Sequence, residues 1–145
     1  MSADNWTPAP QFSTLQRGAR LPEDLLSEVV RCTKNGAVLF AIGAVEDPVV
    51  AYYRREDKHY EETELKGVWE VVSLLGNVTR KEGQPFLHAH ATLSDAGGHT
   101  RGGHLVRATV AVTLEIALWH SAIPDRSFDA DIGLFLVPPQ PLLEQ

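Results

Sequence analysis

The chain lacks several features that often narrow a protein's function. Its single cysteine, Cys32, excludes an intrachain disulfide. Because Cys32 falls in a stretch with helical spacing, we interpret it as a packing residue rather than a nucleophile. No apolar run is long enough to span a bilayer, and the first residues lack the basic start and apolar core of a signal peptide. We therefore expect a cytoplasmic protein with no membrane partner.

Basic charge is also scarce. Thirteen Lys and Arg residues stand against 19 Asp and Glu residues, which gives a formal net charge of −6. Nucleic acids and anionic membranes attract proteins largely through lysine and arginine. The basic residues are dispersed, with adjacent pairs only at Arg54-Arg55 and Arg80-Lys81. This balance argues against binding to either partner by a general electrostatic route.

Familiar catalytic signatures are missing as well. The chain has no Gly-x-Gly-x-x-Gly at a strand-to-helix junction and no P-loop, so we expect no nucleotide cofactor. Gly-x-Ser-x-Gly, Cys-x-x-Cys and His-Glu-x-x-His are also absent. These absences argue against a serine hydrolase elbow, a dithiol site and a helical metallopeptidase.

What is present fits one globular domain. The chain has 145 residues, of which 43% are hydrophobic and 22% charged. Residues 1–20, which include Pro8 and Pro10, show no sustained period, so we expect an irregular N-terminal arm there. We place a single domain at residues 21–140 and a tail at residues 141–145.

One helix is predicted early in the chain, over residues 22–35. Pro22 suits the first helical turn, and the acidic residues after it suit the positive end of the helix dipole. Gly36 is a typical helix stop. The expected buried stripe consists of apolar residues at helical spacing, namely Leu25, Leu26, Val29 and Val30.

Strands are predicted for most of the remaining chain. Short apolar or alternating runs mark them at residues 37–43, 48–53, 59–65, 68–75, 85–94, 104–118 and 132–137. The first run is wholly apolar and indicates a buried strand, and Gly76-Asn77 should end the fourth. Because most connections are short, the order predicts an α+β fold with a largely antiparallel sheet of about seven strands.

Three histidines form the most informative pattern. His88 and His90 are separated by one residue in a predicted strand, so both should point to the same face. His104 follows Gly102-Gly103 and begins the next strand, which brings the three imidazoles together if that strand pairs back. Three neutral imidazoles suit zinc and leave one coordination position open. The alternative is that these histidines are the polar lining of a ligand groove or a subunit interface.

The other candidate residues carry a weaker signal. We interpret His59, His99 and His120 as ordinary polar residues. Glu115 is the one acid in the long apolar strand, where an unpaired buried carboxylate is costly. It either supports the histidines as a partner or general base, or faces solvent or a subunit interface.

Several of these stretches resemble the PPC (plants and prokaryotes conserved) domain family. The resemblance covers roughly residues 20–118, and its motifs follow in the family's order and spacing. The matching stretches are Ala41–Val45, Trp69–Asn77, Pro85–Asp95 and Gly102–Leu105.

The resemblance implies an α+β fold, assembly as a homotrimer and a metal site at His88, His90 and His104, with zinc as the occupant. Stand-alone prokaryotic members are often labelled DNA-binding by analogy with plant relatives, which carry a separate AT-hook centred on Arg-Gly-Arg-Pro. The most similar segment here is Arg17-Gly18-Ala19-Arg20-Leu21-Pro22. It has an extra residue before the second arginine and lacks basic flanking residues. Direct DNA binding is therefore not expected.

The sequence assigns no reaction to the chain. It favours a small trimeric PPC-like protein with a histidine-lined site for a metal or a small ligand. One alternative is a DNA-associated regulator that acts through protein partners. Another is a zinc-dependent enzyme, because a metal held by three histidines can generate hydroxide near neutral pH.

Overall fold

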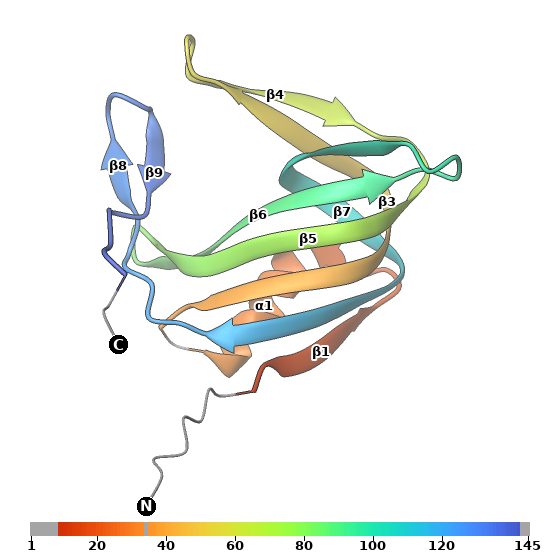
Figure 1. Ribbon diagram of the computed structural model, residues 1–145, viewed down its shortest axis with the longest axis horizontal. Helices are drawn as coiled ribbons and strands as arrows, with labels where there is room; N and C mark the ends of the chain where they lie inside the picture. Colours follow the sequence, from red (N-terminus) through yellow and green to blue (C-terminus); the bar gives the residue numbers. More distant parts are fainter. Residues whose placement is uncertain (1–8, 34, 143–145) are drawn as a thin grey trace, which may run out of the picture.

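One helix packs against a seven-stranded antiparallel sheet in the computed structural model, which describes residues 9–33 and 35–142 (Figure 1). The α+β fold predicted from the sequence is confirmed. The elements are β1 (Gln11–Gln16), β2 (Arg20–Leu21), α1 (Glu23–Cys32), β3 (Ala37–Arg54), β4 (His59–Glu64), β5 (Val68–Lys81), β6 (Gln84–Ser94), β7 (Thr100–His120), β8 (Ser127–Asp129) and β9 (Leu134–Leu136). Strands β8 and β9 pair only with each other.

The sheet rolls back on itself. β5 pairs with β3 and β6, and the long β7 pairs with both β6 and β3, so these four strands form a closed circuit. The apolar side chains on the inner face meet α1, whose Leu25 and Val29 are fully buried. This burial is the main stabilising contribution that links the helix to the sheet. Among the described residues, no helix is long and apolar enough to cross a membrane.

Helix α1 begins where the sequence predicts and ends slightly earlier. Pro22 caps it, and the backbone turns extended at Thr33 instead of continuing to residue 35. The prediction that Val30 belongs to the buried stripe is wrong, because Val30 is exposed, and Cys32 is exposed as well. The interpretation of Cys32 as a packing residue is therefore wrong, because the helix surface at this point faces away from the sheet.

Several predicted strand boundaries are also wrong. The strand that carries His104 begins at Thr100 rather than at His104. Residues 37–43 and 48–53 belong to one strand, β3, whose register against β7 shifts at several points after Gly43. Strand β5 continues through Gly76 to Lys81. A Cβ atom at Gly76 would lie 2.6 Å from the backbone oxygen of His88, so the glycine permits close pairing with β6 rather than ending the strand.

The expectation of an irregular N-terminal arm is wrong for residues 11–16. These residues form β1, which pairs with residues 113–118 of β7. Most β1 side chains are exposed, so their sequence carries little apolar alternation even though each residue of the strand pairs with β7. Residues 1–8 of the expected arm and residues 143–145 of the expected tail lie outside the described residues. The domain boundaries themselves stay a prediction.

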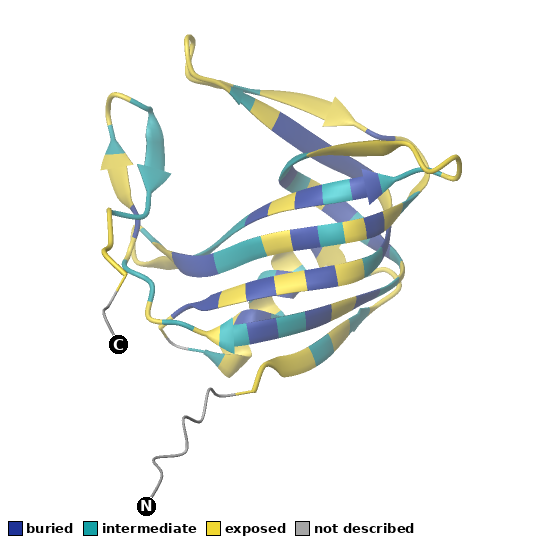
Figure 2. Cartoon of the chain, in the orientation of Figure 1, coloured by how far each residue is buried: buried dark blue, intermediate teal, exposed yellow. Residues whose placement is uncertain are grey.

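The apolar run at residues 37–43 is buried on one face only. Val38, Phe40 and Ile42 are 45%, 44% and 53% exposed, while the residues between them face the core. Figure 2 shows this alternation along β3 and its neighbours. Direct pairing places Phe12, Ala117, Phe40 and Leu75 in one row across β1, β7, β3 and β5. We refer to Phe12, Val38, Phe40, Ile42 and Leu75 as the outer apolar face.

Candidate metal centre

Strand alternation on β6 sets the direction of two histidines. Ala89 is buried against the core, so His88 and His90 on either side of it project from the opposite face of the sheet. His90 pairs directly with Leu75 of β5, which extends the row of the outer apolar face by one strand. The candidate centre therefore lies at the edge of that face.

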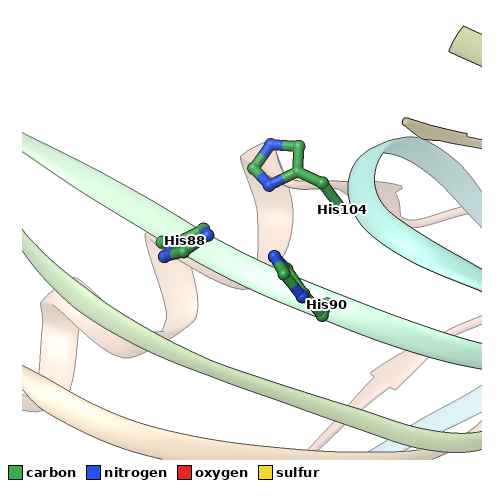
Figure 3. Close-up of side chains that lie close together, drawn as sticks. All are labelled: His88, His90 and His104. Atoms are coloured by element: carbon green, nitrogen blue, oxygen red, sulfur yellow. The ribbon is translucent and has the colours of Figure 1, made fainter. Parts of the chain in front are cut away.

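The third histidine comes from β7. His104 pairs directly with His90, and β7 here runs between β6 and β3. The preceding Gly103 makes this possible, because a Cβ atom there would lie 2.8 Å from the backbone oxygen of Ala51 on β3. The three imidazoles converge, as the spacing predicts (Figure 3).

The geometry of the histidine cluster is close. Ring centroids are 5.1 Å apart for His88 and His90, 5.3 Å for His88 and His104, and 5.7 Å for His90 and His104. One ligand atom from each ring lies within 4.8 Å of the others. Since zinc binds imidazole nitrogen at about 2.0–2.1 Å, small side-chain rotations bring all three nitrogens within reach of one ion.

The environment favours the neutral form of two of these imidazoles, those of His88 and His104. Burial lowers the pKa of His88 to about 4, with further contributions from Arg126 and the two neighbouring histidines. Burial also lowers the pKa of His104, helped by His90 and Arg126. Only a neutral imidazole has a lone pair for a metal, so His88 and His104 are ready to coordinate one near neutral pH.

One ring nitrogen has no partner. Nδ1 of His104 is buried and makes no hydrogen bond in the described part of the chain. A buried polar atom without a partner costs free energy, and a bound metal ion is one partner that removes this cost. The residues present therefore fit a metal ion.

The structure also brings residues to the cluster that sequence reasoning missed. The Tyr60 ring on β4 lies 5.0 Å from the His104 ring. Arg126, in the loop before β8, lowers the pKa of both His88 and His104 by its charge. Neither residue has a motif around it, and both approach from segments distant in the sequence.

The remaining sequence candidates lie elsewhere. Glu115 is exposed and sits eleven positions along β7 from His104, so it cannot act as a base or partner at the cluster. It faces outward beside Ile42 and Thr14, which agrees with the solvent or interface alternative. His99 is an ordinary polar residue, as predicted, because its backbone N–H and its ring contact the Asp95 carboxylate.

Two hollows adjoin the histidine cluster. One, of about 490 Å³, is bounded by His88, His90 and part of the outer apolar face. The other, of about 450 Å³, lies between His88, His104 and the β8–β9 hairpin. Among the described residues, no Asp or Glu side chain lines either one. In the part of the chain that the structure describes, neither hollow therefore holds a carboxylate general base.

Fold and site together define a class: small α+β proteins in which a rolled antiparallel sheet presents three histidines on its outer side. The model of the Plants and Prokaryotes Conserved (PCC) domain, also abbreviated PPC, matches residues 8–121. The chain belongs to this family, as the resemblance in its sequence indicates. No curated protein matches the chain in sequence.

Solved structures agree with this assignment. A PPC protein from Pyrococcus horikoshii shares 31% identity, with a TM-score of 0.83 over 93% of this chain and 94% of that one. A metal-containing protein from Archaeoglobus fulgidus shares 34% identity, with a TM-score of 0.82 over 91% and 94%. A protein from Ralstonia eutropha, named a "putative DNA-binding protein", has a TM-score of 0.80 over 92% and 94%. Its 24% identity supports the shared fold alone.

Proposed function

We propose that this protein binds a divalent transition-metal ion, with zinc as the first candidate, through His88, His90 and His104. The observation that carries the proposal is the convergence of three imidazoles, one ligand atom from each within 4.8 Å of the others. The lowered pKa of His88 and the unpartnered nitrogen of His104 support it. So does the similarity to the metal-containing protein from Archaeoglobus fulgidus.

The histidines would hold the ion and leave a position free for another ligand. A zinc ion held in this way polarises an oxygen ligand or lowers the pKa of bound water. The chain's own residues supply neutral nitrogen ligands and exclude part of the solvent. Because no carboxylate lines the hollows beside the cluster in the described residues, we favour ligand or metal binding over zinc-dependent hydrolysis. A zinc-dependent enzyme is the alternative function.

Metal analysis of purified variants tests this proposal. His88→Ala and His90→Ala should abolish stoichiometric zinc, because two imidazoles bind zinc far more weakly than three. The fold should persist, since both side chains project away from the core. His59→Ala and His120→Ala are matched controls on exposed strand positions, and they should retain zinc. The measurement is the metal-to-protein ratio after zinc exposure and desalting at neutral pH.

Two outcomes would contradict the metal proposal. One is wild-type protein that retains no zinc, nickel or iron. The other is His88→Ala protein that retains as much zinc as wild type while circular dichroism shows an intact fold. Either result would leave the histidines as polar lining of a ligand groove or of a contact between subunits.

We also propose that the working unit is a homotrimer in the cytoplasm. The support is the family to which the chain belongs, together with the apolar side chains left exposed on the outer apolar face. A DNA-associated role through protein partners is the alternative function. It rests on the name of the Ralstonia eutropha protein, whereas the net charge of −6 opposes direct DNA contact.

A further inference from the structure

The hollow between the histidines and the β8–β9 hairpin has aromatic walls. Its volume of about 450 Å³ is in the range of small-molecule sites. The rings of Tyr60, Phe86, Phe128 and Phe135 line it, and the short β8–β9 hairpin closes one side. We call this hollow the aromatic pocket. Such walls favour a ligand with a flat apolar body.

Two cations enter the aromatic pocket. The Lys81 ammonium lies 5.2 Å from the Phe86 ring centroid and 4.7 Å from that of Phe135. The Arg126 guanidinium carbon lies 5.3 Å from the Phe86 centroid. Both side chains therefore sit over aromatic faces rather than fully in water.

Neither cation is neutralised within the described chain. Arg126 is only 9% exposed. It donates hydrogen bonds to the neutral oxygens of Thr79 at 2.9 Å, Asn77 at 2.8 Å and Phe135 at 3.2 Å. No ion pair to a carboxylate involves Arg126 or Lys81 among the described residues, and no acidic side chain lines the pocket.

The aromatic pocket therefore carries an excess of positive charge. The hydrogen bonds of Arg126 explain how it holds the loop before β8 to β5, but they leave its charge uncompensated. Burying an unpaired cation is costly unless an anion joins it. A metal ion at His88 and His104, which also line the pocket, would add further positive charge to the same space.

We propose that the aromatic pocket binds a small organic acid, a carboxylate carried on a flat apolar body. The body packs between the aromatic rings, and the carboxylate faces Lys81, Arg126 and the ion held by the histidines. The part of this inference that involves the metal rests on the proposed function. The part that involves Lys81, Arg126 and the rings does not.

Calorimetric titration with three probes tests the ligand class. Benzoate has both the body and the charge, benzamide keeps the body without the charge, and inorganic phosphate has charge without the body. Benzoate should bind the zinc-exposed wild-type protein at least about tenfold more tightly than either other probe, which corresponds to about 1.4 kcal/mol. Equal binding of benzoate and benzamide, or tighter binding of phosphate, would overturn the proposal.

Variants locate the site. Lys81→Gln should weaken benzoate binding about tenfold, the usual scale of one charge-assisted contact, without changing zinc stoichiometry. Phe128→Ala, at a ring that is 59% exposed, should weaken benzoate without loss of fold. Lys66→Gln is the matched control, because Lys66 pairs with Glu64 away from the pocket. If Lys81→Gln and Lys66→Gln bind benzoate equally well, the anion is not in this pocket and the inference fails.

The same titrations separate this inference from the metal proposal. Zinc retention without selective benzoate binding would overturn the pocket and leave the metal site standing. Benzoate binding that depends on Lys81 in a protein without zinc uptake would overturn the metal site and support the pocket. A change in the visible spectrum of cobalt-exposed protein on addition of benzoate would support contact between anion and metal, and an unchanged spectrum would overturn that contact.

Discussion

At the scale of single residues, His88 combines burial with a nearby positive charge. Both effects disfavour the imidazolium and lower its pKa from 6.5 to about 4. The unfolded chain lacks both effects, so it takes up a proton at higher pH than the folded chain. Folding is therefore favoured by His88 above about pH 6.5, and this contribution is lost as the pH falls from there through 4.

We predict a specific proton linkage from this shift. Metal-free wild-type protein should lose stability between pH 6.5 and 4, and the His88→Gln variant should lose less over the same range. The difference should correspond to about one proton taken up on unfolding. Urea unfolding at a series of pH values measures it. Parallel stability curves for the two proteins would show that the His88 imidazole is not shielded as the structure has it.

The sequence alone predicts some residues of the candidate metal centre and misses others. The histidine cluster could be predicted, because period-two alternation fixes His88 and His90 and a short turn returns the chain at His104. Tyr60 and Arg126 could not, since each reaches the cluster from a segment with no local pattern that points there. Their placement follows from long-range packing, which sequence periodicity does not encode.

At the scale of elements, the type of each long segment could be predicted better than its ends. Apolar alternation identifies β3, β5, β6 and β7, but it does not show that a strand continues through a glycine or a bulge. Gly76 looks like a strand end in the sequence and proves to be a point of close strand pairing. Strand β1 escapes detection because most of its side chains are exposed, so its sequence shows little apolar alternation.

The irregular pairing of β3 around Gly43 gives a prediction at this scale. The residue has a φ of +155°, and a Cβ atom there would lie 2.0 Å from the Thr113 backbone oxygen on β7. Gly43→Ala forces backbone to move and should cost roughly 2–4 kcal/mol of stability. Gly67→Ala is the comparison, because its φ of +85° is strained but nothing lies within 4 Å. It should cost about 1 kcal/mol.

Chemical denaturation of the two glycine variants checks this ranking. A Gly43→Ala midpoint well below that of Gly67→Ala is the expected result. Equal midpoints would mean that β3 and β7 can separate locally at no cost, which contradicts the close approach of the two strands at Gly43.

At the scale of the whole molecule, the outer apolar face is expected to be buried by another copy of the chain. Large exposed apolar patches mark interaction surfaces in soluble proteins, and this one crosses four strands. We predict that wild-type protein has three times the chain mass of 16.0 kDa in light scattering. Phe40→Asp, in the middle of the face, should reduce the mass toward that of one chain. Tyr52→Asp is the control, 72% exposed on the same strand but in the β3–β4 hairpin.

The result for the wild-type protein decides the assembly. A stable monomer at micromolar concentration would remove the trimer proposal. A trimer that Phe40→Asp leaves intact would place the contact on another surface.

Assembly also affects DNA binding, because a trimer carries three times the net negative charge of one chain. A trimer would carry three times the net charge of −6 per chain, and protein–DNA affinity depends largely on phosphate neutralisation by lysine and arginine. We predict no submicromolar binding to random duplex DNA at physiological salt, measured by fluorescence anisotropy. If submicromolar binding is found, its salt dependence gives the number of phosphate contacts. A steep dependence would show that a local basic surface outweighs the net charge, and the DNA-associated role would then become the leading function.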